Sequence, residues 1–184
     1  MVNKICVDPG HGMSNVNKGR YDPGATHDEN GVAYEEATIA LQYGLTLRAE
    51  LQSRGKSVFM TRDDATDHAP VGQRATNAKK VGCDMLVSLH LNAFSSDAAN
   101  GIEVLYGNMA HKPLADRLLA ALLPVTGLKS HSNDFRPDLA VLKFDGPAVL
   151  IELGFIGNDH DRETLLNPAM RTLICQTIAD VITA

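Results

Sequence analysis

Short apolar runs, separated by polar stretches rich in turn-forming residues, dominate the pattern of this chain. A run of about four to eight apolar residues bounded by Gly, Pro or charged residues is typical of a buried strand. On this basis the sequence predicts six strands, over residues 4–7, 57–61, 84–89, 102–106, 139–143 and 148–153.

Between these runs the apolar residues recur with helical spacing. In residues 34–54, Ile39, Tyr43 and Leu47 fall at steps of four, and Gly55 follows as a stop signal. The same spacing predicts three more helices, over residues 70–81, 112–124 and 159–184. We expect the inner face of the last helix to hold Leu165, Leu166, Leu173, Ile174, Ile178 and Ile182.

Strands and helices alternate along the chain, and no linker-like tract divides it. This order is typical of an α/β protein, because a parallel strand needs a crossover helix to return to the same sheet. We therefore expect residues 1–184 to form a single domain. Its largely parallel mixed sheet of about six strands is covered by helices on both faces.

The composition narrows the functions that the chain can carry. Of its 184 residues 44% are hydrophobic and 21% charged, the formal net charge is −5, and no basic run argues for nucleic-acid binding. Cys6, Cys83 and Cys175 lie far apart in apolar surroundings, so we expect buried free thiols. We also expect no signal peptide and no membrane contact, since no charged and apolar leader or long apolar run is seen. We further expect a monomer.

Three predicted strands lead into a polar residue that an apolar core does not normally contain. His11 lies in the turn Asp8-Pro9-Gly10-His11-Gly12 after the first strand, His90 follows the third strand, and Glu152 ends the last. The C-terminal ends of parallel strands lie at one edge of a sheet, where ligand sites collect in open α/β folds. We therefore expect these three side chains to converge.

A carboxylate pair, Glu35-Glu36, opens the first long helix and lies near the same edge if the helix follows the usual crossover sense. Two imidazoles and a carboxylate are the ligands of many catalytic zinc sites, and a further carboxylate can take a proton from water. Structural interpretations stay open: His11 can stabilise its turn, His90 can be a core residue, and Glu35-Glu36 can complement the helix dipole. Glu152 differs, because an ionised carboxylate in so apolar a strand is costly unless it is paired or bound to a metal.

These residues belong to a series of motifs that resembles the zinc-dependent N-acetylmuramoyl-L-alanine amidases of the amidase-3 type. The motifs are VDPGHG at 7–12, DPGA at 22–25, TRDD at 61–64, QRATN at 73–77, LVSLHLNA at 86–93, GIEV at 101–104 and PAVLIELGFI at 147–156, followed by Asn158. The resemblance spans nearly the whole chain in order. It implies peptidoglycan as substrate, and cleavage of the amide that joins the lactyl group of N-acetylmuramic acid to the first L-alanine of the stem peptide.

The resemblance also implies roles for single residues. Zn²⁺ would be held by His11, His90 and a glutamate at the start of the first long helix, and Glu152 matches the catalytic glutamate. We prefer Glu36 as the ligand, because it shares the inward helix face with Ile39. The pair Tyr34-Glu35 also fits the way in which this helix begins in the family, which keeps Glu35 as the alternative.

The chain departs from the family pattern in two places. Residues 13–21 form a longer link than the usual short Gly-rich one, and we expect them to reshape one wall of the cleft. Only a few residues separate Tyr106 from Lys112, where regulated periplasmic members carry a long insertion that occludes the zinc. We therefore expect an open site in an endolysin-like enzyme of phage or prophage lysis, or in an excised catalytic domain. Such an enzyme is made in the cytoplasm and acts on the cell wall or in the periplasm.

Several further residues have two interpretations each. Asp8 either orients a neighbouring imidazole or caps its turn. Arg74, Asn92 and Glu103 lie in family-like motifs and are expected to shape the cleft. Arg74 fits an exposed position on its helix equally well, and Glu103 an exposed position on its strand.

Other functional classes give contrasting expectations. A zinc exopeptidase would share the His/Glu/His chemistry but needs an arginine for a terminal carboxylate, for which Arg136 is the loop candidate. A non-catalytic wall-binding module would not need Glu152. A phosphate site at the Gly-rich turn 8–12 is excluded as a P-loop, because no Gly-Lys-Ser/Thr follows it.

Overall fold

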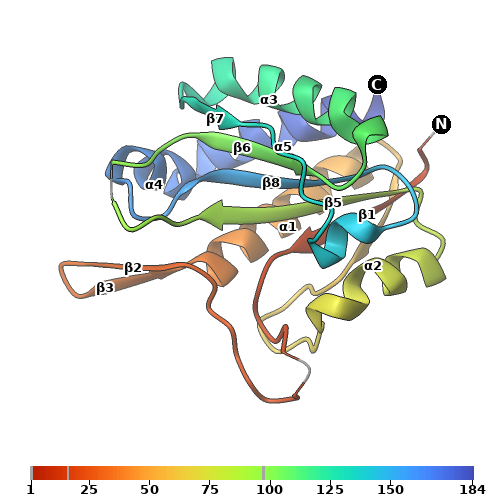
Figure 1. Cartoon of the computed structure of the whole chain (residues 1–184), viewed down its shortest axis with the longest axis horizontal. Coiled ribbons are helices and arrows are strands. Elements are labelled where there is room, and N and C mark those ends of the chain that lie inside the picture. Colours follow the sequence, from red (N-terminus) through yellow and green to blue (C-terminus); the bar gives the residue numbers. More distant parts are fainter. Residues whose placement is uncertain (1, 16, 97) are drawn as a thin grey trace.

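The computed structural model describes residues 2–15, 17–96 and 98–184, which form an α/β domain around a six-stranded sheet (Figure 1). The strands follow the order β4-β1-β5-β8-β6-β7 across the sheet. Their bounds are β1 Lys4–Pro9, β4 Ser57–Met60, β5 Met85–Asn92, β6 Ile102–Tyr106, β7 Ser130–Ser132 and β8 Ala148–Phe155. Strands β4, β1, β5 and β8 are parallel to one another, whereas β6 runs antiparallel to β8. The prediction of a largely parallel mixed sheet is therefore confirmed.

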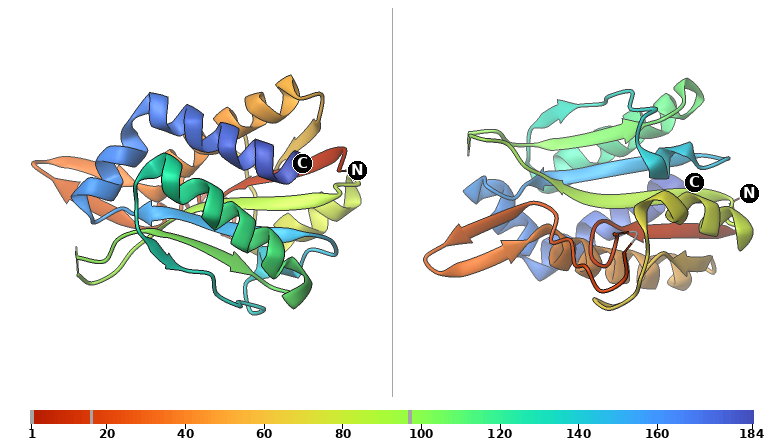
Figure 2. Two further views of the ribbon diagram at one scale, coloured as in Figure 1. Left: turned by 90° about the horizontal axis from the view of Figure 1, so that it is seen from above. Right: turned by 60° about the horizontal axis from the view of Figure 1, so that its bottom comes forward.

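Helices cover both faces of the sheet, as predicted. The main helices are α1 Glu36–Ser53, α2 Val71–Lys80, α3 Lys112–Thr126, α4 Asp159–Leu166 and α5 Pro168–Thr183, with short 3₁₀ helices η1 Met109–His111 and η2 Ala140–Lys143. Helices α1, α3 and α5 pack together over one face (Figure 2, left). Helix α2 packs against η2 on the other face (Figure 1). In the described part of the chain no helix is long and apolar enough to cross a membrane.

Alternation along β5 decides which residues face each layer. Val87 and Leu89 belong to the larger core under α1, α3 and α5, whereas Leu86 belongs to the smaller core under α2 and η2. Because successive side chains in a strand point to opposite faces, Ser88 and His90 follow Leu86 on the α2 side. On this side Leu86 and Ser88 are buried, but His90 is partly exposed. The cover of α2 and η2 therefore ends before the C-terminal end of the strand, and a cleft begins there.

One predicted strand is wrong. Residues 139–143 were expected to join the sheet, but residues 140–143 form the 3₁₀ helix η2. The side chains of Val141 and Leu142 are buried in the smaller core, so their apolar character reflects packing against the sheet rather than pairing within it. Periodicity cannot separate these two cases in so short a run.

Two strand regions were not predicted. A two-stranded hairpin, β2 Thr26–Glu29 and β3 Val32–Glu35, projects from the body of the domain next to the start of α1 (Figure 1). Its turn at Asn30-Gly31 has positive φ at both residues, which suits a tight hairpin. Strand β2 is polar, and none of the eight residues of the hairpin strands is buried, so they lack the alternation of buried apolar and exposed polar residues that identifies a strand. The second region is β7, which pairs in parallel with β6.

The predicted closing helix is divided in two. Pro168 has no backbone N–H, and the side chain of Asn167 accepts hydrogen bonds from the backbone N–H groups of Ala169 and Met170, so α5 starts anew there. Of the expected inner face, Leu165, Ile174, Ile178 and Ile182 are buried, but Leu173 is 43% exposed. The placement of Leu173 on the inner face was therefore wrong. The three cysteines are free and buried, as expected.

Candidate metal centre and catalytic cleft

His11 is held in an unusual backbone conformation at the end of β1. Its φ is 60°, a left-handed value that non-glycine residues seldom adopt. The flanking loop is closed by a pair of backbone hydrogen bonds between Gly12 and Asp22, at 2.9 and 2.8 Å. The Asp22 carboxylate lies 2.9 Å from Nδ1 of His11 and also accepts a hydrogen bond from the hydroxyl of Ser14. These contacts fix the imidazole so that its other nitrogen, Nε2, faces the start of α1.

His90 and Glu152 come from neighbouring strands. They are register partners in the parallel pair of β5 and β8, and both face the side covered by α2. Both strands continue past these residues, to Asn92 and Phe155, so the expectation that His90 and Glu152 end their strands was wrong. Across the other edge of β8, Glu103 on β6 pairs in register with Glu152. The sheet thus places three polar side chains in one row.

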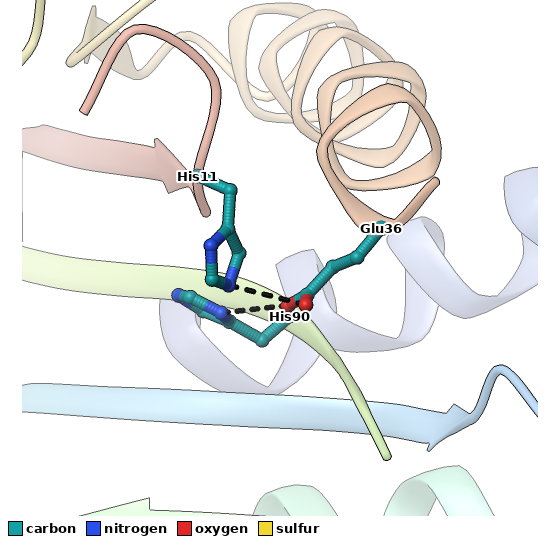
Figure 3. Close-up of side chains that lie close together, drawn as sticks. All are labelled: His11, Glu36 and His90. Atoms are coloured by element: carbon teal, nitrogen blue, oxygen red, sulfur yellow. Dashed lines mark hydrogen bonds and ion pairs between the residues drawn. The ribbon is translucent and has the colours of Figure 1, made fainter. Parts of the chain in front are cut away.

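Glu36, and not Glu35, joins the two histidines. Its carboxylate lies 3.1 Å from His11 Nε2 and 2.8 Å from His90 Nδ1 (Figure 3). The backbone N–H groups of Leu91 and Ala25 also donate hydrogen bonds to it. Strand β3 ends at Glu35, whose carboxylate accepts a hydrogen bond from the hydroxyl of Tyr21 instead.

The three side chains form a group that could hold a metal ion, with one ligand atom from each residue and all these atoms within 4.8 Å of one another. Glycines of two sequence motifs make this approach possible. A Cβ atom on Gly10 would overlap the His90 ring, and one on Gly24 would overlap both the Glu36 carboxylate and the His11 ring. The backbone at the site therefore depends on the absence of side chains at these two positions.

The electrostatics favour a bound cation. Burial raises the pKa of the Glu36 carboxyl, but the hydrogen bonds from His11 and His90 outweigh burial and hold the pKa well below its usual range. Burial lowers the pKa of His11, yet the neighbouring carboxylates of Glu36 and Asp22 raise it to about 9. The carboxylates around His11 thus favour positive charge at this position, which is how a site built for a cation behaves.

Glu152 lies beside this group in a different environment. Its Oε2 atom is buried and has no hydrogen-bond partner within the described ranges. Burial raises the pKa of the Glu152 carboxyl to about 7; His90 opposes this shift, while Glu36 and Glu103 add to it. A carboxyl with a pKa near neutrality can both accept and donate a proton under ordinary conditions.

Asp8 does not orient an imidazole, in contrast to one of its two expected roles. It is fully buried, and its carboxylate accepts hydrogen bonds from the hydroxyls of Thr61 and Ser88, both at 2.6 Å, and from Arg74 at 2.9 Å. The carboxylate at Nδ1 of His11 belongs to Asp22 instead. Asp22 begins the motif at residues 22–25, but the motif alone did not indicate this role.

Two buried arginines hold the His11 turn by hydrogen bonds to its backbone carbonyl groups. Arg74, 2% exposed, donates hydrogen bonds to the backbone carbonyl groups of Pro9 and His11, so its interpretation as an exposed helix residue was wrong. Arg62 donates to the carbonyl groups of Gly10 and Ala37 and thereby ties the turn to the first residues of α1. Sequence reasoning quoted Arg62 only as part of a motif and missed this role.

The remaining predicted residues have defined places. Asn92 and Ser132 each donate a hydrogen bond to the Glu103 carboxylate, so both Asn92 and Glu103 line the row beside Glu152. Arg136 forms an ion pair with Asp138 at 2.8 Å.

The two departures from the family pattern are also visible. The link after Gly12 lies against residues 68–71, where Ala69 and Val71 donate backbone hydrogen bonds to the carbonyl groups of Met13 and Ser14. The expectation for residues 13–21 includes Val16, which lies outside the described residues. Between β6 and α3 the chain forms only the short helix η1.

Taken together, the fold and the site define an α/β domain with a candidate single-metal centre on the less covered face of its sheet. Residues 5–184 match the amidase-3 family, N-acetylmuramoyl-L-alanine amidase, and the chain belongs to this family. It is 30% identical over 177 residues to the "Probable cell wall amidase LytH" of Staphylococcus aureus, a match that covers 96% of this chain but 56% of that protein.

Solved structures agree with this family. The catalytic domain of CwlV, an N-acetylmuramoyl-L-alanine amidase from Bacillus (Paenibacillus) polymyxa, is similar with a TM-score of 0.86 and 28% identity, over 98% of this chain and 96% of that one. An N-acetylmuramoyl-L-alanine amidase from Clostridium difficile 630 gives a TM-score of 0.87 and 25% identity, over 99% of this chain and 95% of that one.

Proposed function

We propose that this chain is a zinc-dependent amidase that hydrolyses the bond between N-acetylmuramic acid and the first L-alanine of the peptidoglycan stem peptide. The observation that carries the proposal is the group of His11, Glu36 and His90, with Glu152 in register beside His90. Membership of the amidase family supports the choice of bond and substrate. We further propose the cell wall as the place of action.

The residues present suit zinc. Two imidazole nitrogens and one carboxylate are a common ligand set of catalytic zinc sites, which keep a further position open. Asp22 on the far nitrogen of His11 matches the carboxylate that usually orients a metal-bound histidine. When bound, the ion would supply a Lewis acid that polarises the amide carbonyl and makes water a stronger nucleophile.

Glu152 is the proposed proton carrier. Its carboxylate accepts a proton from the water that attacks the amide carbonyl and then delivers this proton to the leaving alanine nitrogen. Among the residues that the structure describes, none forms a hydrogen bond with Oε2, which leaves this atom available for the exchange. Glu103 stays beside it as a fixed negative charge, held by Asn92 and Ser132.

The proposal is tested by digesting purified peptidoglycan with the zinc-loaded protein and labelling the new amino termini. Amidase activity releases stem peptides with N-terminal alanine and leaves the glycan chains intact. The Glu152→Gln variant is expected to keep zinc and lose this release, while His90→Ala loses the metal as well. Release of alanine at the parent rate by Glu152→Gln would refute the assignment of Glu152.

A further inference from the structure

Two adjoining hollows lead away from the candidate metal centre on the side covered by α2 and η2. The first, about 170 Å³, is lined by His11 and His90, by the polar side chains of Asp8, Ser14, Asp22 and Arg74, and by apolar side chains. These apolar side chains are Val71, Leu139, Val141 and Leu150. The second hollow, about 470 Å³, continues between α2 and η2, and Ala140 lies in the walls of both. The two hollows are hereafter called the α2–η2 groove.

Small residues line the second hollow on both the α2 side and the η2 side. Gly72, Ala75 and Ala140 line the second hollow, and Gly72 and Ala75 lie on one face of α2 because they are three residues apart. A Cβ atom added to Gly72 would have no neighbour within 4 Å, so the space above this residue is open. Small side chains on both walls leave room for an extended chain.

The far end of the groove carries positive charge. Lys79 and Lys143 line it together with one acidic residue, Asp145, in a protein whose net charge is −5. Lys79 forms an ion pair with Asp145, but both side chains are more than half exposed, so this pair is weak and easily exchanged. Within the described residues no ion pair involves Lys143. The end of the groove is thus suited to a carboxylate.

We infer that the α2–η2 groove binds the stem peptide on the alanine side of the scissile bond and that it favours a third residue with a side-chain carboxylate. This inference rests on the proposed function. The apolar first hollow suits the alanine methyl group. The sugar on the other side of the bond has no free carboxylate once its lactyl group is in the amide, so within the substrate only the peptide can offer the lysines a carboxylate.

The dimensions agree with this assignment. Val71 lines the first hollow and Lys79 the far end of the second, and Lys79 follows Val71 by eight positions along α2, a rise of about 12 Å at ~1.5 Å per residue. In an extended peptide the third residue lies about 7 Å from the first at ~3.3 Å per residue, and its side chain bridges the remaining distance. Diaminopimelate, which is lysine with a carboxylate added to its terminal carbon, is a third residue of this kind.

The test compares two N-acetylmuramoyl tripeptides that differ only in diaminopimelate or lysine at the third position. For an exposed ion pair we expect a preference of about fivefold in kcat/KM for the diaminopimelate substrate, mostly through KM. The double variant Lys79→Gln, Lys143→Gln should bring the two substrates to equal rates. Equal rates in the parent protein would overturn the inference and leave the proposed function intact.

A binding measurement separates the groove from catalysis. The free tripeptides are titrated by NMR into the metal-depleted protein, with Gly72→Leu as the variant that fills the groove and Gln73→Leu as its control on the exposed face of α2. Both variants place leucine, a good helix former, on α2, so we expect the helix to be preserved. We expect Gly72→Leu to abolish the shifts of groove residues and Gln73→Leu to keep them. Unchanged binding in Gly72→Leu would refute the groove, even if the protein hydrolysed neither substrate.

Discussion

Replacing Glu152 by Gln is expected to change how the stability of the metal-free protein depends on pH. The pKa of the Glu152 carboxyl rises from its ordinary value of 4.5 to about 7 in the folded protein, chiefly because of burial. Between these two pH values the folded protein keeps a proton that the unfolded chain has released. The folded state therefore binds more protons there, and the free energy of unfolding falls as the pH rises.

The size of the effect follows from the two pKa values. A difference of about 2.5 corresponds to about 3 kcal/mol, since one pKa unit is worth about 1.4 kcal/mol. This penalty is absent below about pH 4 and fully present above about pH 8. For a chain of this length it corresponds to a difference in melting temperature of about 6–12 °C. Glutamine cannot ionise, so the Glu152→Gln variant escapes the penalty.

The assay is urea unfolding followed by circular dichroism at several pH values between 4 and 8, in the presence of a chelator. The decisive quantity is the change with pH of the difference between variant and parent. A packing cost of the new amide that does not depend on pH cancels in this quantity. The titrations of the histidines, which both proteins share, largely cancel as well. The exposed carboxylate on α4 gives a control, and Glu163→Gln should run parallel to the parent. A difference between Glu152→Gln and the parent that stays constant with pH would refute the reasoning.

Three further predictions concern the support of the metal centre. His90→Ala should lose bound zinc in elemental analysis while keeping its circular dichroism spectrum, and retention of one zinc per chain would contradict its role as ligand. Asp22→Asn should weaken zinc binding by about 10- to 100-fold in a chelator competition, because it replaces the carboxylate beside His11 Nδ1. An unchanged zinc affinity would show that this contact is dispensable. Arg74→Met should lower the free energy of unfolding by about 3–5 kcal/mol, because it removes the cation that is paired with the buried Asp8 carboxylate. The double variant Arg74→Met, Asp8→Asn should recover part of this loss.

The spacing of apolar residues was sufficient to predict an element where the buried residues are also the ones that form the strand or helix. Strand β6 begins and ends where its apolar run does, because Ile102, Val104 and Tyr106 are buried in one core while Leu105 is buried in the other. The helical spacing of Ile39, Tyr43 and Leu47 likewise identified α1, and all three are buried. Residues 139–143 show the limit of this reasoning, since an apolar run that packs on a sheet looks the same as one that pairs within it.

The candidate site was only partly determined by the sequence. Motifs and residue types singled out His11, His90 and Glu152, because burying an ionisable group costs free energy unless the group is paired or bound to a metal. The choice between Glu35 and Glu36 depended on where the unpredicted hairpin ends and α1 begins. That boundary turns Glu36 toward the two histidines and Glu35 toward Tyr21.

The tertiary structure alone decided the supports and the surroundings of the site. The register of β5, β8 and β6 puts His90, Glu152 and Glu103 in one row, and register depends on contacts between segments far apart in the chain. The same holds for Arg74, whose spacing on α2 gives no hint that its guanidinium reaches the His11 turn. A sequence specifies which side chains must be buried or paired, but the partner that satisfies each buried charge is chosen by the way the elements pack.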